Sequence, residues 1–580
     1  MPLLTLTALT VSLLGMAFFG AGVFRGAAPA AAAVLAAVAA VVAWRRRSRK
    51  TGGTAKWSPI LVAGVAVLAV LLCTLLPLPM HLGLLMGPTR LASQLDVADA
   101  LEAAAELDVL PARYPFFSLT RNKAGTMRIT VIAAAALAAA VLAASLPAQW
   151  RHACAWILVA MAAAVAAAGV ASRLWWPQGS TVWWLFPVGD SLPGPLGCFV
   201  NRNHFGGFVA MMSPLALVLV TDNLTARRFL SGACGAAALV ITTAAVFLSL
   251  SRGAIIAYAA GMLFTAFLVL RQKGPAPALA GVFLLAALGM GAWFLPHPAV
   301  RQRIESLRHV LQDSSLRTRM EAWADTTRIW RTYPVFGAGA NAYRMVYPQH
   351  RRTSARAFRE HAENEYLQLA AEGGVIGVGL LVLLLIAVTL EMRNARAAPH
   401  VAPYRTAALG ALAVAGVHAL VDFPLRTPLY AIALAVVVAL SFAPDGQRRR
   451  ALAPCLLPLL VVVLLCPFWR TMRRRDSTRH IAEAPLNELA RALCWAPTSW
   501  RTWYYFGGRV ARAGTQEATI LGERCMSNAA AYDPNNYVLW QALCEVRLQR
   551  GDHKGAQEAF DRAQRLRFWL TPPKGLSSGN

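Results

Sequence analysis

Apolar runs of about 20 residues recur along almost the whole chain and constrain its fold more than any other feature. A helix of this length crosses the hydrocarbon core of a bilayer, which is about 30 Å thick. Of the 580 residues, 57% are hydrophobic and only 14% are charged, whereas soluble domains carry roughly 25% charged residues. Alanine and leucine dominate the runs, and the alternation typical of membrane strands is absent. The sequence therefore predicts an all-α, polytopic membrane protein.

About thirteen runs meet this length requirement. The predicted spans are residues 3–24, 27–44, 58–80, 129–146, 152–172, 204–221, 229–250, 254–270, 276–295, 373–390, 404–421, 428–443 and 452–469. The predicted organisation is a first part of a transmembrane bundle at 1–295, a large loop at 296–372, a second part of the bundle at 373–469, a helical region at 470–570 and a disordered tail at 571–580.

Clusters of Arg and Lys in the short loops predict the orientation, because such clusters stay in the cytoplasm. The clusters are Arg45–Lys50, Arg227–Arg228, Arg271–Lys273, Arg393 with Arg396, and Arg448–Arg450. If the spans alternate, all five lie on the side of the N-terminus. The loop at 296–372 and the region after 470 then lie on the outer side. The net charge of +28 sits beside membrane spans, which favours membrane lipids or a diphosphate as partners and argues against nucleic acid.

The region after residue 470 is polar and has amphipathic helical periodicity. Pro497–Trp503 and Pro534–Trp540 match each other 37 residues apart, which resembles a tetratricopeptide repeat of about 34 residues. Such a module either binds a protein partner or acceptor, or only packs on the bundle as a small helical cap.

Two short polar motifs stand at the outer ends of spans. Asn201, Arg202, Asn203 and His204 open one span, where an anion could sit at the helix N-terminus; the alternative is a capping motif with Asn203 as N-cap. Arg252, between Ser251 and Gly253, interrupts a long apolar stretch. An arginine at membrane depth costs about 2.5–3.5 kcal/mol on insertion scales and usually has a partner or a function.

The large loop carries two further motifs. A helix predicted from Ser314 through Trp330 contains Arg317 and Arg319, and the run Pro334–Gly339 ends it. The alternative is a helix lying on the membrane surface. Closer to the next span follow His361, Glu363, Asn364 and Tyr366. Histidine is the usual general base near neutral pH, although a lone histidine is more often structural.

The chain has no pattern typical of a metal or nucleotide cofactor. Its nine cysteines include no CxxC pair, and no Walker, dinucleotide-binding or HExxH motif is present. His418 and Asp422 share a helix face if the helix continues, and without a third ligand a local hydrogen bond between them is favoured over a metal site. We expect no cofactor and no metal.

Taken together, the ordered motifs resemble the O-antigen ligase and polymerase superfamily of membrane glycosyltransferases. The resemblance covers about residues 190–430: an Asn-rich mouth at Asn201–His204, a Ser-Arg-Gly turn at Ser251–Gly253, Arg319 on a loop helix, the break at Pro334–Gly339 and the run His361–Gly377. It implies a GT-C-like bundle with a large periplasmic loop in the bacterial inner membrane. A tetratricopeptide-like tail resembles one branch of this superfamily.

The resemblance also implies a metal-independent, inverting transfer from an undecaprenyl-diphosphate-linked glycan. Arg252 and Arg319 match catalytic arginines and would hold the diphosphate, and a histidine would deprotonate the acceptor hydroxyl. Asn201, Arg202, Asn203, His204, Arg317, Glu363, Asn364 and Tyr366 are the expected substrate-binding residues. Many members have His where this chain has Glu363, so the base is either His361, which we favour, or Glu363.

Several activities remain open. The acceptor implied by the resemblance is lipid A core, a polysaccharide or a protein. The corresponding enzymes are a ligase of lipopolysaccharide or exopolysaccharide, a polysaccharide polymerase and a protein glycosyltransferase. A transporter of lipid-linked sugars is less favoured, because transporters place polar residues within the spans. A membrane-anchored scaffold would not need so many spans or the ordered loop motifs.

Overall fold

We analysed a computed structural model of the chain. It describes residues 2–18, 35, 38, 58–76, 88–107, 118–175, 181–182, 186–187, 196–273, 314–352, 359–395, 399–442, 481–567, 570–573 and 575–576. Three predicted spans, 27–44, 276–295 and 452–469, lie outside them except for Leu35 and Val38, and so does half of the tail 571–580.

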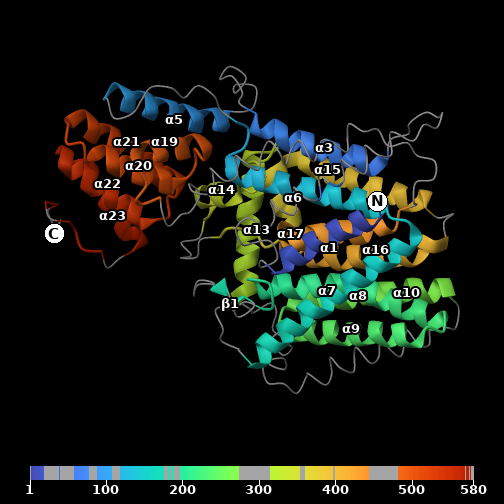
Figure 1. Ribbon diagram of the computed structural model, residues 1–580. Helices are drawn as coiled ribbons and strands as arrows, with labels where there is room; N and C mark the ends of the chain where they lie inside the picture. Colours follow the sequence, from blue (N-terminus) through green and yellow to red (C-terminus); the bar gives the residue numbers. More distant parts are fainter. Residues whose placement is uncertain are drawn as a thin grey trace, which may run out of the picture.

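Apolar helices side by side form the larger part of the molecule (Figure 1). They are α1 (Pro2–Phe18), α3 (Pro59–Leu75), α6 (Lys123–Ala144), α7 (Ala148–Trp175), α8 (Arg202–Thr225), α9 (Phe229–Leu248), α10 (Arg252–Lys273), α15 (Glu365–Asn394), α16 (Ala402–His418) and α17 (Pro428–Leu440). Each coincides with a predicted span. Six of the described helices are long and apolar enough to cross a membrane, which confirms an all-α, multi-pass membrane protein.

Asparagine side chains begin three of these helices, each by accepting a hydrogen bond from a backbone N–H of the first turn. Asn122 starts α6, Asn201 starts α8 and Asn364 starts α15. Such caps satisfy N–H groups that have no partner within the helix. The capping residue of α8 is therefore Asn201, and the expectation that Asn203 has this role is wrong.

Burial separates the centre of the bundle from its rim. The most apolar stretch of α8 is entirely enclosed by protein, whereas only 17% of that of α15 is buried. Exposed valine, leucine and isoleucine side chains such as Val375, Val382 and Ile386 cover α15. An apolar face of this kind is suited to lipid rather than water.

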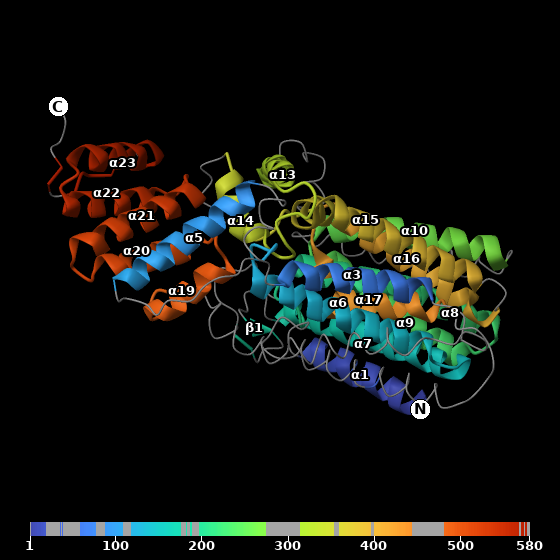
Figure 2. The same ribbon diagram turned by 90° about the horizontal axis from the view of Figure 1, so that it is seen from above.

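Two shorter helices of the large loop lie at one end of the bundle. They are α13 (Ser314–Thr332) and α14 (Tyr343–His350). The axis of α13 runs across the bundle helices, and Figure 2 shows it end-on beside the start of α15. A short antiparallel ribbon, β1 (Thr181–Val182) and β2 (Phe186–Pro187), lies near the same end.

The C-terminal region forms a helical layer beyond this end (Figures 1 and 2). It contains α19 (Leu486–Trp495), α20 (Trp500–Ala511), α21 (Gln516–Tyr532), α22 (Tyr537–Arg550) and α23 (His553–Leu566). Gly551, in the left-handed conformation at φ 83°, ends α22, and Asp552 caps α23. The assignment of this region as tetratricopeptide repeats stays a prediction.

A helix from the N-terminal half joins this layer. Helix α5 (Pro88–Glu106) buries Val97, Leu101 and Ala104 in one apolar cluster with side chains of α19, α20 and α21. Arg524 pairs with Asp99 at 2.8 Å. The sequence pattern does not predict this helix pairing, because its partners lie some 400 residues away along the chain.

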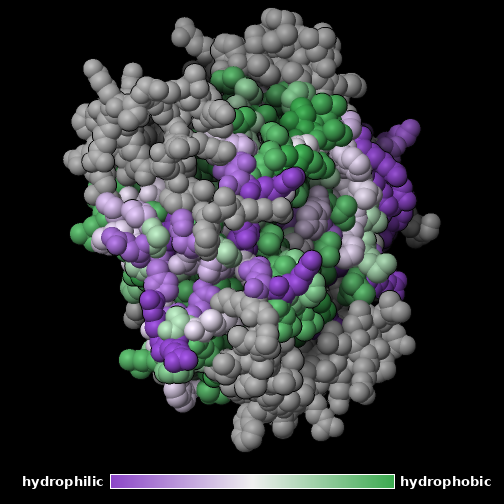
Figure 3. All heavy atoms as spheres, turned by 90° about the vertical axis from the view of Figure 1, so that its right-hand side faces the viewer, coloured by the Kyte–Doolittle hydropathy of each residue, from purple (hydrophilic) through white to green (hydrophobic). Residues whose placement is uncertain are grey.

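The N-terminus and the basic connections within the described residues lie at the opposite end of the bundle (Figure 1). Arg227 and Arg228 join α8 to α9, and Arg393 closes the last turn of α15. Seen from this end, hydrophilic side chains are spread among hydrophobic ones (Figure 3). The loop helices and the C-terminal region thus lie at one end, and these basic residues lie at the other.

Candidate functional site

The turn after α16 carries a buried acidic centre. Asp422 Oδ1 lies 3.2 Å from His204 Nε2, and Asp422 Oδ2 lies 3.8 Å from His418 Nε2. The other ring nitrogen of His204 is 3.1 Å from the hydroxyl of Thr427. Burial alone would raise the pKa of Asp422, but the hydrogen bond from His204 and the two nearby imidazoles hold it well below its ordinary value.

This arrangement differs from the predicted His418–Asp422 helix face. Helix α16 ends at His418, so Asp422 stands in the following turn, and its shorter contact is with His204 from α8. His204 begins a span in the sequence, and only the tertiary structure brings it to Asp422. Among the described residues, no group of three or more His, Cys, Asp or Glu could hold a metal ion.

Two glycines allow the neighbouring helices to approach this turn. A Cβ at Gly207 would lie 2.3 Å from the His418 ring, and a Cβ at Gly253 would lie 2.6 Å from Val421. Helix α8 at Gly207 and the Ser-Arg-Gly turn at Gly253 are therefore packed against His418 and the turn that follows it. Arg252 itself is the first residue of α10, at the end of the bundle where the site lies.

The break after α13 is bound to the start of α15 by backbone hydrogen bonds. The N–H groups of Ala338 and Gly339 donate to the carbonyls of Ala371 and Glu372, at 2.8 and 2.9 Å, and Val375 N–H donates to Pro334 at 2.8 Å. These contacts join two motifs that are about 35 residues apart in the sequence. They place the Glu372 side chain under the loop.

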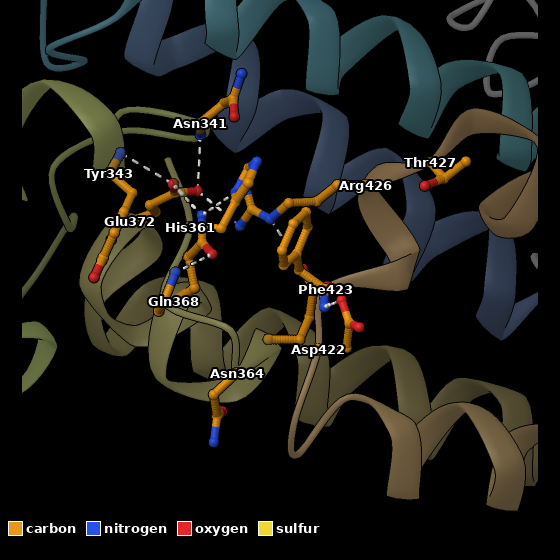
Figure 4. Close-up of polar contacts among 12 residues, drawn as sticks. Asn341, Tyr343, His361, Asn364, Gln368, Glu372, Asp422, Phe423, Arg426 and Thr427 are labelled. Carbon is orange, nitrogen blue, oxygen red and sulfur yellow. Dashed lines mark hydrogen bonds and ion pairs between the residues drawn. The ribbon is translucent and has the colours of Figure 1, made fainter. Parts of the chain in front are cut away.

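Glu372 accepts four hydrogen bonds at the centre of the site (Figure 4). Its donors are the backbone N–H groups of Asn341 and Tyr343, the Gln368 amide and the Arg426 guanidinium, at 2.8, 3.1, 3.0 and 2.9 Å. Arg426 Nε also lies 3.2 Å from Glu365. Burial opposes the charged form of Arg426, but the carboxylates of Glu372 and Glu365 hold its pKa above the ordinary value.

His361 lies against this network. Its ring stacks on Phe423 with 3.9 Å between centroids, and its Nδ1 lies 3.1 Å from Gln368 Nε2. Burial, followed by the positive charges of Arg426, His204 and Arg128, holds the pKa of His361 well below its ordinary value. The imidazole is therefore neutral near pH 7.

Glu363 lies next to the predicted arginine. Arg319 NH2 is 3.0 Å from Glu363 Oε2, and Arg319 NH1 donates to the Val421 carbonyl at 2.8 Å. The side chains of Arg319 and Glu363 keep 22% and 30% of their surface exposed, so both remain accessible. Burial raises the pKa of Glu363, and the charge of Arg319 offsets this only in part.

The backbone of Glu363 is strained, with φ at 55°. This left-handed conformation is uncommon for a residue with a Cβ, and strain of this kind clusters at functional sites.

The remaining predicted residues are not all in this cluster. Asn364 caps α15 and donates to the Leu420 carbonyl at 3.0 Å, and Tyr366 donates to Gly416 at 2.9 Å while staying 41% exposed. Arg317 points to solvent on α13 and pairs with Glu321 at 3.5 Å. Arg202 and Asn203 are half-buried at the start of α8. The structure thus brings together Arg319, His361, Glu363 and His204 but leaves Arg317 outside.

Sequence reasoning missed three members of the network. Gln368 and Glu372 lie within the run His361–Gly377, where the sequence assigns them no role, and Arg426 lies outside every predicted motif. A signal for Arg426 was present, because it is an arginine in the short turn between two predicted spans. Its partners Glu365 and Glu372 could not be inferred without the fold.

A family model described as O-antigen ligase matches residues 237–382, a segment that contains Arg252, Arg319, His361 and Glu363. No curated protein matches the chain. The segment 237–382 is thus similar to the O-antigen ligase family, and it lies within a multi-pass helical membrane protein.

Proposed function

We propose that the protein transfers a glycan from undecaprenyl diphosphate to an acceptor hydroxyl on the periplasmic face of the bacterial inner membrane. The reaction would be a metal-independent, inverting ligation, with lipopolysaccharide or exopolysaccharide as product. The observation that carries the proposal is the pairing of accessible Arg319 with Glu363 beside His361, at the bundle end away from the basic connections.

Each group has a chemical reason to be there. A guanidinium binds diphosphate oxygens in a bidentate manner, and it stabilises the charge that develops on the leaving group. Arg319 and Arg252 would supply this charge. A base, His361 or Glu363, would take the proton of the acceptor hydroxyl. The exposed apolar face of α15 supports access for a lipid-linked donor from the bilayer.

A second activity of the same superfamily is a polysaccharide polymerase or a protein O-oligosaccharyltransferase. The observation in its favour is the helical layer of α5 and α19–α23 beside the site. A surface of this size could hold an extended glycan or a protein acceptor.

The experiment compares surface glycans and glycoproteins in cells that lack the gene, with complementation by wild type, Arg319→Ala, Arg252→Ala and His361→Ala. We expect a glycan to lose its attachment or its length in the deletion, and Arg319→Ala to restore less than about one hundredth of the wild-type level. Lost attachment indicates a ligase, and lost length indicates a polymerase.

The matched control is Arg331→Ala, which removes an exposed arginine from the same helix α13. It should complement like wild type. Unchanged glycans in the deletion strain, under conditions in which the protein is made, would contradict the proposed function.

A further inference from the structure

The hydrogen bonds around His361 determine which of its ring nitrogens carries the proton. Gln368 lies between three partners: its Oε1 accepts from the backbone N–H of Ala362 at 3.1 Å, and its Nε2 lies 3.0 Å from Glu372 Oε1 and 3.1 Å from His361 Nδ1. A backbone N–H is always a donor, so the oxygen of the Gln368 amide must face Ala362. The amide nitrogen then faces Glu372 and His361.

Glu372 confirms this orientation of the amide. Its two oxygens already face the backbone N–H groups of Asn341 and Tyr343 and the guanidinium of Arg426, all of which can only donate. A carboxylate among such donors accepts from Gln368 as well. The two N–H bonds of the Gln368 amide are therefore directed at Glu372 and at His361 Nδ1.

His361 Nδ1 is thus a hydrogen-bond acceptor, and the neutral ring carries its proton on Nε2. A ring in this tautomer offers an N–H donor to a ligand and has its lone pair occupied by Gln368. The same geometry disfavours imidazolium, because a proton on Nδ1 would meet the N–H of Gln368. The structure prepares His361 to donate a hydrogen bond and not to take a proton.

Glu363 has the properties of a base. Its carboxylate is partly exposed, lies next to Arg319 and is held by a strained backbone. The charged groups that act on it are Arg319 from α13, Arg359 from its own loop, and Asp422 and His204 from the turn and α8. Diphosphate bound at Arg319 would neutralise the guanidinium and raise the proton affinity of the carboxylate beside it.

We propose that Glu363 is the general base of the transfer, and that His361 is a hydrogen-bond donor oriented by Gln368 and Glu372. This inference rests on the proposed function. The proton of the acceptor hydroxyl moves to Glu363, and the acceptor oxygen forms a bond to the anomeric carbon. The bond from that carbon to the diphosphate oxygen breaks, and undecaprenyl diphosphate leaves with the electron pair. His361 Nε2–H donates to an oxygen of the diphosphate and keeps its proton.

The test uses membrane vesicles from the deletion strain that express each full-length variant. Such vesicles supply the host's own lipid-linked glycan and acceptor, and transfer is followed by gel mobility and glycan staining. Glu363→Gln should reduce transfer at least about 100-fold, because the amide keeps the size of the side chain but cannot take up the proton. Glu360→Gln, an exposed neighbour in the same loop, is the matched control and should leave transfer unchanged.

Two substitutions of His361 separate a donor from a base. His361→Gln keeps an N–H donor near the Nε2 position and should stay within about tenfold of wild type, whereas His361→Ala should lose about 100-fold. In His361→Gln, transfer should still fall at acid pH as Glu363 takes up a proton. The pKa of Glu363 is raised, so this fall begins above the ordinary glutamate range of about 4.3.

The outcomes are distinct. If His361→Gln is as inactive as His361→Ala while Glu363→Gln is active, the inference is wrong and His361 is the base, although the proposed function stands. If wild-type vesicles show no transfer that depends on Arg319, the proposed function itself fails. Should Glu363→Gln not accumulate as folded protein, Glu363→Asp replaces it: partial transfer supports the inference, and wild-type transfer by His361→Ala contradicts it.

Discussion

At the scale of single residues, three glycines hold the loop of the site in place. Gly337, Gly339 and Gly374 all have positive φ, at 61°, 105° and 61°. All three also lie where a side chain would collide with backbone: a Cβ would be 2.1 Å from Glu372 at Gly337, 2.7 Å from Thr120 Cα at Gly339 and 2.3 Å from the Val335 carbonyl at Gly374. Only glycine permits both the conformation and the close approach that seats Glu372 under the loop.

Gly374→Ala should therefore lower the free energy of unfolding by 1 kcal/mol or more, on the order of magnitude known for Ala at positive φ. Transfer should fall with it, because the loop and Glu372 would separate. Thermal unfolding in detergent or nanodiscs measures the first effect. Gly379→Ala is the control on the same helix, with nothing within 4 Å of the added Cβ, and a loss of stability equal to that of Gly374→Ala would contradict the explanation.

At the scale of helices, one buried ion pair connects the large loop to the C-terminal layer. Arg351, which follows α14, lies 2.7 Å from Asp533 at the end of α21, and their side chains are only 11% and 5% exposed. The Asn535 side chain also donates to the Arg351 carbonyl at 2.9 Å. Burial raises the pKa of Asp533, and Arg351 offsets part of this effect.

Arg351→Ala should destabilise the protein by about 3–5 kcal/mol, because it leaves a buried carboxylate without its counter-charge. The double variant Arg351→Ala/Asp533→Ala should recover part of that loss. Without Arg351, the pKa of Asp533 rises further above the unfolded value of about 3.9. Asp533 then stays protonated up to a higher pH in the folded state than in the unfolded state. The free energy of unfolding therefore decreases as pH rises above about 4.

Thermal unfolding of the single and double variants between pH 5 and 8 checks both statements. The melting temperature of Arg351→Ala relative to wild type should fall with rising pH in this range, and that of the double variant should not. Equal stability of the single and double variants at pH 8 would show that the buried carboxylate carries no penalty.

At the scale of the whole molecule, the site, the loop helices and the C-terminal layer all gather at one end of the bundle (Figures 1 and 2). The N-terminus and Arg227, Arg228 and Arg393 are at the other end. Since basic connections stay in the cytoplasm, we expect the site to face the periplasm.

A pair of fusions to the full chain tests this orientation. Green fluorescent protein at the N-terminus should fluoresce, and alkaline phosphatase at the C-terminus should be active, because the first requires the cytoplasm and the second the periplasm. An inactive C-terminal phosphatase in a stable fusion would place the helical layer, and with it the site, on the cytoplasmic side.

The sequence by itself determined the helical membrane architecture and most of the residues around the site. Apolar runs of bilayer length admit little besides helices, because backbone polar groups in lipid must bond within their own segment. The ordered motifs also pointed to His361, Glu363 and Arg319, since polar residues at the ends of such runs are few and therefore conspicuous.

Only the tertiary structure decided what each of these residues contacts. Asp422 pairs with His204 from a distant helix more closely than with its neighbour His418. Arg426 and Gln368 belong to the site because each donates a hydrogen bond to Glu372. Helix α5 packs on helices some 400 residues away along the chain. These contacts depend on how helices pack and on which atoms face one another across the chain, and neither hydrophobic periodicity nor local spacing contains that information.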